Sequence, residues 1–275
     1  KNESLAALLA SRQSPDTAGV VRMWLGEPVA IKEPTAVTFR RQSGCHLLII
    51  GQQEEAAMAM MAGGMIALAA QHSPSQARFI VLDGSPADSP LARVFGQVKD
   101  VLPHRIDLVE YRAVADAIGD LAGEIERRQF GEEATPPAIF LFVYGLQRYR
   151  VLRRQEDGFS FSMDSEGAKS QPDRQLADLL REGPPLGIHV IAWCDTHATV
   201  ERSLDRNSLR EIDNRVLFQM SAADSSNLID SPLANKLGVN RALAYSEEQG
   251  TTEKFRPYAL PPAAWLARIK AQWHR

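Results

Sequence analysis

The chain has 275 residues, of which 44% are hydrophobic and 24% are charged, and its formal net charge at neutral pH is -3. These values are ordinary for a globular protein and exclude a disordered one, and the length suits one large α/β domain with or without a small appendage. The slight negative charge gives no general attraction to nucleic acid, so strong nonspecific DNA binding by this chain alone is not expected.

The chain contains two cysteines, and both lie within apolar runs that resemble buried strands. Neither Cys45 nor Cys194 belongs to a C-x-x-C motif or has a histidine at ligand spacing. We interpret them as core thiols of a cytoplasmic protein and expect no metal site. No apolar run reaches the roughly 18 residues of a membrane span, and no signal peptide is recognisable. Because residue 1 is Lys1, we expect the chain to be a piece of a longer polypeptide.

The first forty residues differ from the rest of the chain. A polar leader at 1–19 precedes short β-prone segments that are interrupted by turn residues at 26–28 and 33–34. This pattern predicts one or two hairpins at the edge of a sheet. From there on, predicted strands and helices alternate. Strands are predicted at 46–50, 78–83, 105–110, 138–144, 187–194, 214–220 and 241–246, and helices at 54–71, 90–101, 112–130, 172–183 and 201–211, with a helix-prone stretch at 145–155.

The central strands are apolar almost continuously, without the alternation of a half-exposed strand. This indicates burial on both faces of a mainly parallel sheet, and the strand–helix repetition predicts a doubly wound α/β fold. The polar loop at 155–173 is either a surface loop or a segment that faces a channel or a partner. A final helix is predicted within 261–275, and we expect it to pack on this domain or on a neighbouring subunit. Its apolar face is formed by Trp265, Leu266, Ile269 and Trp273.

Several separated motifs in the second half of the chain resemble those of the FtsK/SpoIIIE class of P-loop ATPases, which is related to HerA. That class has a Gly-Ile-His-Leu strand leading to Ala-Thr-Gln-Arg-Pro, then RIAFKVSSxxDSRxILD, then LLGxGDMLY. The counterparts here, in the same order, lie at 187–190, 214–221, 224–230 and 236–245. The resemblance implies a RecA-like domain over 20–260, with a mainly parallel central sheet flanked by helices and a small β-rich N-terminal edge.

The same resemblance places the phosphate loop of the class, G-x-x-G-x-G-K-[ST], on residues 51–58, where only Gly51 matches. A working loop needs glycines for close approach to the phosphates, Lys to bind them and Ser or Thr to bind Mg²⁺. Those positions carry Glu54, Ala56, Ala57 and Met58. Glu54 and Glu55 are also expected in the first turn of a helix, where two carboxylates stabilise the helix start and repel a polyphosphate. We therefore expect neither ATP nor Mg²⁺ to bind.

Two further catalytic elements of the class are absent. The strand that in the class ends in Asp-Glu here ends in Val143, Tyr144 and Gly145, and the glutamine that senses the γ-phosphate aligns with Cys194. The absence of all three elements argues against hydrolysis, and we predict no catalytic residue. In the class, the segments around Arg215 and Arg241 approach a neighbouring subunit, so these arginines are expected either at an interface or in salt bridges within the domain.

Other polar residues are given structural interpretations. Asp83 is expected to cap a turn, and His46 and His189 to be satisfied histidines of the core or the sheet edge. The basic run at 148–154 is interpreted as a solvated face above a buried stripe of Leu146, Tyr149 and Leu152, with a phosphate-contacting patch as the alternative. No G-x-S-x-G elbow and no G-x-G-x-x-G fingerprint occurs.

The sequence thus predicts a degenerate, catalytically inactive FtsK/SpoIIIE-type domain that acts as a structural, regulatory or partner-docking module of a larger ATPase. Its expected partners are other ATPase domains of the same polypeptide or oligomer and a protein or peptide ligand, with DNA contacted only through the larger assembly. The alternative is a DNA translocase motor that binds ATP and Mg²⁺ through divergent residues. A third hypothesis, a module that binds secretion signals as in type VII secretion ATPases, rests on the resemblance alone.

Overall fold

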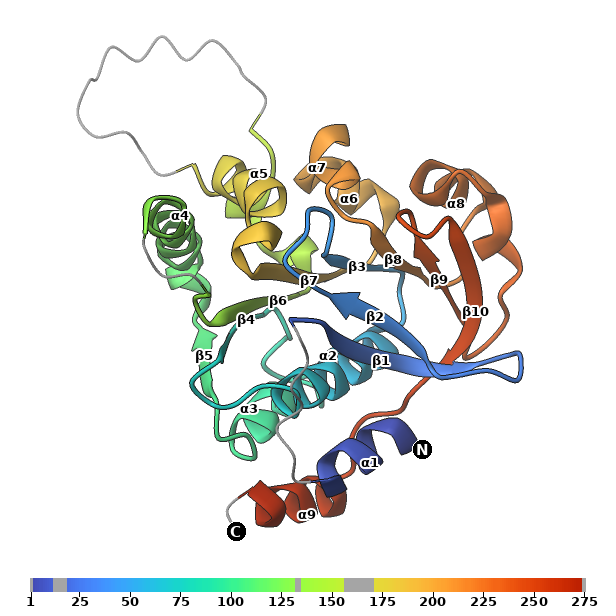
Figure 1. The fold of residues 1–275 in the computed structure, drawn as a ribbon. Helices are drawn as coiled ribbons and strands as arrows, with labels where there is room; N and C mark the ends of the chain where they lie inside the picture. Colours follow the sequence, from blue (N-terminus) through green and yellow to red (C-terminus); the bar gives the residue numbers. More distant parts are fainter. Residues whose placement is uncertain (1, 12–18, 132–134, 156–170, 274–275) are drawn as a thin grey trace, which may run out of the picture.

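The structure, a computed structural model, describes residues 2–11, 19–131, 135–155 and 171–273 (Figure 1). Most of the polar loop predicted at 155–173 lies outside these ranges, so both interpretations of that loop stay predictions. Among the helices of the described ranges, none combines the length and the hydropathy that crossing a bilayer requires.

Ten strands of the described chain form one sheet at the centre of the domain, in the order β2-β1-β10-β9-β8-β3-β7-β6-β4-β5. The six strands from β8 to β5 are parallel to one another, whereas the four strands from β2 to β9 pair antiparallel with their neighbours. The bounds are β1 Val21–Pro28, β2 Thr35–Phe39, β3 Leu47–Ile50, β4 Ala77–Asp83, β5 Arg105–Val109, β6 Ala138–Tyr144, β7 Ile188–Cys194, β8 Asn214–Leu217, β9 Ala242–Ser246 and β10 Thr251–Pro257. The mainly parallel sheet and its β-rich N-terminal edge are confirmed.

Helices cover both faces of the sheet (Figure 1). One apolar layer contains α1, α2, α3 and α9, and the other contains α4 to α8. The α-helices are α1 Glu3–Ser11, α2 Glu54–Ala69, α3 Val94–Lys99, α4 Val114–Phe130, α5 Pro172–Glu182, α6 His197–Ser203, α7 Arg206–Arg210, α8 Ala222–Ile229 and α9 Ala263–Trp273. Turns of 3₁₀-helix are η1 Tyr111–Ala113, η2 Leu146–Arg148, η3 Arg150–Leu152, η4 Pro184–Leu186 and η5 Pro232–Lys236.

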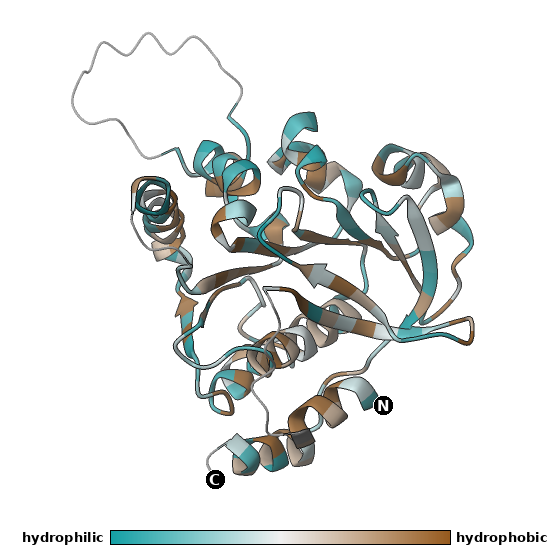
Figure 2. Ribbon diagram, in the orientation of Figure 1, coloured by the Kyte–Doolittle hydropathy of each residue, from teal (hydrophilic) through white to brown (hydrophobic). Residues whose placement is uncertain are grey.

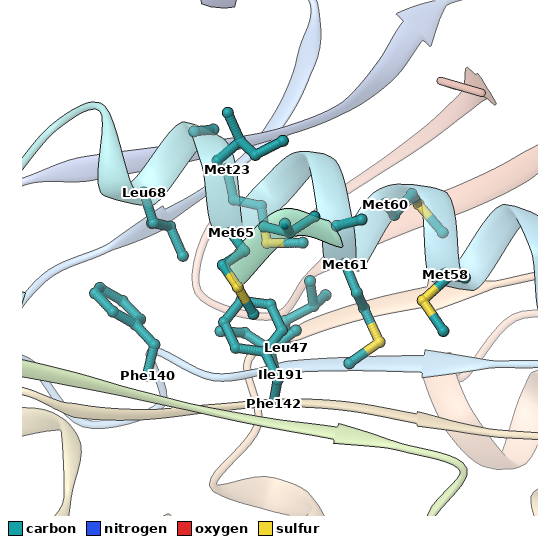
Figure 3. Packing of buried hydrophobic residues seen from close by; sticks show 14 of the residues in the cluster. Met23, Leu47, Met58, Met60, Met61, Met65, Leu68, Phe140, Phe142 and Ile191 are labelled. Atoms are coloured by element: carbon teal, nitrogen blue, oxygen red, sulfur yellow. The ribbon is translucent and has the colours of Figure 1, made fainter. Parts of the chain in front are cut away.

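Helix α2 is buried on nearly all sides, which explains its Ala- and Met-rich sequence. Met58, Met61 and Met65 point toward the sheet, while Met23 of β1 lies on another side of the helix (Figure 3). A Cβ at Gly64 would lie 2.6 Å from the Met23 sulfur, so glycine is needed where β1 crosses the helix. The central strands are likewise hydrophobic along their length (Figure 2). Strand β1, near the N-terminal edge of the sheet, therefore packs directly against α2.

Several elements differ from the sequence expectation. Residues 3–11, part of the expected polar leader, form α1, whose Leu5 is buried in the core. The helix-prone stretch at 145–155 forms only η2 and η3, because Tyr149 between them has an extended backbone. The helix expected at 201–211 is divided into α6 and α7 at Asp205, whose side chain caps α7. Strand β10 and helix α8 had no counterpart in the expectation. Helix α9 packs back on the domain through Leu266 and Ile269.

Candidate functional site

The connection between β3 and α2 is only three residues long. Strand β3 ends at Ile50 and α2 begins at Glu54. The N–H of Ala57 already donates a helical hydrogen bond of 3.0 Å to the carbonyl of Gln53. The positions of the second and third loop glycines, Glu54 and Ala56, thus lie in the first helical turn. The chain does not form the open loop whose N–H groups would surround a phosphate.

Gly51 is required by the packing of three strands. Its φ of +129° is outside the range that other residues favour, and an added Cβ would lie 2.7 Å from the Cβ of Phe218. Its N–H donates to the carbonyl of Cys194 at 3.0 Å, and its own carbonyl accepts the indole N–H of Trp193 at 3.0 Å. Gly51, the one glycine shared with the class pattern, therefore forms the turn after β3, where it packs against the ends of β7 and β8.

Internal contacts hold the first residue of α2. A guanidinium nitrogen of Arg148 lies 3.2 Å from the carboxylate of Glu54, and another donates to the carbonyl of Gly84. The hydroxyl of Tyr144 donates to the carbonyl of Glu54 at 3.2 Å. Arg148 and Glu54 are both partly exposed, so their ion pair contributes on the order of 1 kcal/mol or less. These contacts join the start of α2 to the carboxyl ends of β4 and β6.

Tyr144 lies at a position that the sequence resemblance aligns with an acidic residue of the class. Its buried ring stacks on Trp193, with ring centroids 4.6 Å apart. Burial, with a smaller effect of nearby Glu54, raises the pKa of the Tyr144 phenol, which therefore stays a neutral donor. Val143 is buried among apolar side chains, and Gly145 adopts a left-handed conformation in which its N–H donates to the carbonyl of Trp193. No acidic side chain occupies these three positions.

Cys194 is fully buried at the end of β7, where its thiol lies 3.8 Å from the carbonyl of Thr196. Burial raises the pKa of the Cys194 thiol, and burial also raises that of Cys45. A buried thiol with a raised pKa is unreactive, and both cysteines are free, so their interpretation as core thiols is confirmed. Within the described ranges, no group of three or more His, Cys, Asp and Glu side chains could hold a metal ion.

His46 and His189, the two histidines singled out from the sequence, are buried and hydrogen-bonded in the core. His46 accepts the N–H of Val190 at one ring nitrogen, 2.8 Å away, and donates from the other to the carbonyl of Leu180 at 2.9 Å. His189 donates to the carbonyl of Cys45 at 2.8 Å. Burial lowers the pKa of His46 to about 3 and that of His189 to about 4, so both are neutral. Their interpretation as satisfied core histidines is confirmed.

Most of the remaining predicted residues have structural roles. The carboxylate of Asp83 accepts the N–H of Ser85 at 2.9 Å, as expected of a turn cap. In the basic run, Leu146, Tyr149 and Leu152 form the predicted buried stripe. The contact of Arg148 with Glu54 was missed, because no local pattern links residues 94 positions apart.

Of the two arginines considered for a subunit interface, Arg215 is held inside the domain. Its guanidinium donates to the carbonyls of Leu228 and Leu209 at 2.8 and 2.9 Å and pairs with Glu247 at 2.7 Å. This corresponds to the salt-bridge alternative. Arg241 is partly exposed and donates to the carbonyl of Asn240 at 3.2 Å, so a role in an interface stays a prediction for it alone.

An open cavity of about 510 Å³, which no sequence pattern predicted, lies beside the first turn of α2. One wall is formed by the start of α2, including Glu55, Ala56 and Ala59, and the other by the end of β10 and the segment that follows it, from Arg256 to Leu260. The two walls are about 200 positions apart in the sequence and meet only in the folded chain. The cavity therefore offers both charged and apolar contacts next to the site of the missing phosphate loop.

No family model matches the sequence, and no curated protein matches it significantly. Solved structures do match the fold. The cytoplasmic domain of the type VII secretion ATPase EccC from Thermomonospora curvata is 15% identical with a TM-score of 0.64, and the match covers 96% of this chain and 32% of that one. EccC ATPases 2 and 3 in complex with a signal sequence peptide give 18% identity and a TM-score of 0.63, with 89% and 42% covered.

The conjugation coupling protein TcpA of pCW3, solved with ATPγS, is 11% identical with a TM-score of 0.61, and 93% of this chain and 71% of that one are covered. This chain thus spans less than half the length of the EccC chains it matches. At such low identities the likeness concerns the fold. The chain has the fold of the FtsK/SpoIIIE-type P-loop ATPase domains.

Proposed function

We propose that this chain is an FtsK/SpoIIIE-type domain that neither binds nor hydrolyses ATP and serves as a structural and partner-docking module of a larger ATPase. The observation that carries the proposal is the early start of α2. Glu54, at the position of a loop glycine, is already helical and is held by Arg148 and Tyr144.

The physical argument concerns charge and space. A bound triphosphate would have to approach the carboxylates of Glu54 and Glu55, which already occupy the helix end where an anion is favoured. It would also find no lysine to neutralise it and no hydroxyl to hold Mg²⁺, since those positions carry buried Ala57 and Met58. Forming an open loop would require the first turn of α2 to unwind, with loss of the contacts to Arg148 and Tyr144.

The docking role is supported by the cavity beside α2 and by the structural relatives. EccC and EssC structures contain ATPases 2 and 3 in one chain, and one EccC structure holds a signal sequence peptide. We propose that the cavity between α2 and the segment after β10 receives a peptide or a loop of a neighbouring domain. Arg256 and Glu55 would fix its polar groups, and Ala59 and Leu260 would contact its apolar side chains. DNA would be contacted only by the larger assembly.

Calorimetric titration with Mg-ATP tests the loss of nucleotide binding. We expect no binding up to about millimolar nucleotide, which corresponds to a binding free energy weaker than about -4 kcal/mol. The double variant Glu54→Ala/Glu55→Ala should also fail to bind, because Ala57 and Met58 still supply neither a lysine nor a hydroxyl. Micromolar binding by the unaltered chain would falsify the proposal, and DNA-stimulated phosphate release would favour the motor alternative instead.

The docking role is tested with peptides selected from a phage-displayed library on the unaltered domain. Replacing Ala56 with Trp places a large side chain in the cavity, whereas Ala267→Trp adds the same side chain on the exposed surface of α9. Selected peptides should lose affinity for Ala56→Trp and keep it for Ala267→Trp. Equal binding to both variants would place the peptides elsewhere and refute the cavity as the docking site.

A further inference from the structure

Strand β5 forms one end of the sheet and pairs only with β4 on its inner side. Along its outer side no other strand of the described ranges is present. Figure 1 shows this edge, with α4 and α3 on the two faces of the sheet beside it. The outward N–H and C=O groups of an edge strand are a template on which another extended segment can pair.

The α3 side of this edge is left incomplete. Ile106, on the α3 side of β5, is 4% exposed, whereas Leu108, which points to the same side, is 40% exposed. Leu108 is a large apolar side chain in the middle of a regular parallel pairing, and it lacks a neighbour beyond the edge. One more strand with an apolar side chain on this face would cover it.

The α4 side of the edge carries charged side chains. A groove of about 900 Å³ runs between β5 and α4. The arginines of this groove have acidic partners: Asp107 pairs with Arg78 and Arg105 at 2.8 and 3.1 Å, and Glu124 pairs with Arg127.

Three further carboxylates line the groove. Glu110, Asp116 and Asp120 are exposed and form no ion pair with any residue of the described ranges. The uncompensated charge of the groove is therefore negative.

We propose that this edge and groove accept a strand from a partner protein in which apolar residues alternate with Lys or Arg. Side chains of such a strand point alternately to the two faces, so the apolar ones would cover Leu108 while the basic ones would reach Asp116 and Asp120. The main chain would bind the edge of β5, and the two unlike faces would fix the register. This surface lies at the other end of the sheet from the cavity beside α2, so it is independent of the nucleotide question.

A competing explanation is that the charges of β5 only protect the edge, since charged side chains on edge strands suppress unwanted pairing. Arg105 and Asp107 fit that role, because their charges offset each other. The unpaired carboxylates on α4 and the exposed Leu108 do not fit it. Edge protection therefore predicts that no strand binds here.

The test uses an isotope-labelled domain titrated with a short peptide of alternating lysine and valine, followed by NMR. We expect chemical-shift changes and slower amide exchange confined to 105–109 and to the facing turn of α4. The same peptide methylated on every backbone nitrogen should not bind, since it has no main-chain donors. Shift changes centred elsewhere, or equal binding of the methylated peptide, would overturn the proposal.

Charge variants distinguish binding in the groove from nonspecific electrostatic attraction to the whole domain. Asp116→Asn/Asp120→Asn should lower the affinity for the lysine–valine peptide about tenfold at low salt. The control, Glu33→Gln/Asp230→Asn, removes two exposed carboxylates, one between β1 and β2 and one directly after α8, and changes the net charge equally. It should leave the affinity within about twofold of the unaltered chain. Equal weakening by both pairs would mean that the peptide senses only overall charge, and the proposal would fail.

Discussion

The stability of this fold should fall steeply in mild acid because of two buried histidines. His46 and His189 have pKa values of about 3 and about 4 in the folded chain, against an ordinary value of 6.5. Both therefore stay neutral when folded, while the unfolded chain takes up protons below about pH 6.5. Their contribution to stability is complete above the unfolded pKa and is lost as the pH falls toward the folded one. Protonating His46 would also place a proton against the N–H of Val190.

The magnitude follows from proton linkage. Near pH 5 the unfolded chain binds about two more protons at these sites than the folded chain, which gives a slope of about 2.7 kcal/mol per pH unit. Integrated from about pH 7.5 to about pH 5, the loss in free energy of unfolding is on the order of 4 kcal/mol. Urea unfolding at a series of pH values measures the total loss, to which His72 and His104 add because burial lowers their pKa values as well.

The variant His46→Gln isolates one of the two histidines. It should be less stable than the unaltered chain at neutral pH, because two hydrogen bonds are disturbed. Its slope near pH 5, however, should be smaller by about 1.4 kcal/mol per pH unit, since one titrating group has been removed. An unchanged slope would refute the assignment of the acid sensitivity to His46, whatever the loss at neutral pH.

Two further predictions concern packing and buried charge. Gly63 and Gly64 are neighbours in α2, but an added Cβ meets nothing within 4 Å at Gly63 and lies 2.3 Å from the end of Met23 at Gly64. Thermal unfolding should therefore show Gly63→Ala stabilising by about 0.5–1 kcal/mol and Gly64→Ala destabilising by about 1–3 kcal/mol, and equal effects would contradict this packing. Arg215→Ala leaves two carbonyls without their donor and should cost about 2–4 kcal/mol in urea unfolding; a loss below about 0.5 kcal/mol would contradict the internal role of Arg215.

The central elements could be predicted because their signals are local. The apolar run at 138–144 and the continuous apolar residues of β3 are typical of strands buried on both faces. Strand β6 has the predicted bounds, and β3 begins one residue later than predicted. Strand β10 was missed because its residues are polar and mostly exposed, so no apolar pattern identifies it. It pairs with β9 and β1, and those neighbours hold it in the sheet.

The residues of the candidate site were likewise predicted only in part. Residue types alone identified the missing lysine, hydroxyl and acids, since chemistry that needs a charge or a metal ligand cannot be carried by Ala57, Met58 or Tyr144. The start of α2 at Glu54 was also predicted, and it is confirmed. The contacts of Glu54 with Arg148 and Tyr144 could not be predicted, because they form only when the end of β6 lies near the start of α2.

The sequence by itself determined the strand–helix alternation, the buried strands and the loss of the class's charged residues, because each depends on neighbouring residues or on residue type. Only the tertiary structure showed what holds the predicted start of α2: Arg148 pairs with the carboxylate of Glu54, and Tyr144 donates to its carbonyl. The cavity beside α2 and the unpaired outer edge of β5 are likewise visible only in the folded chain. These features join segments tens to hundreds of residues apart, and the packing of the whole sheet brings those segments together.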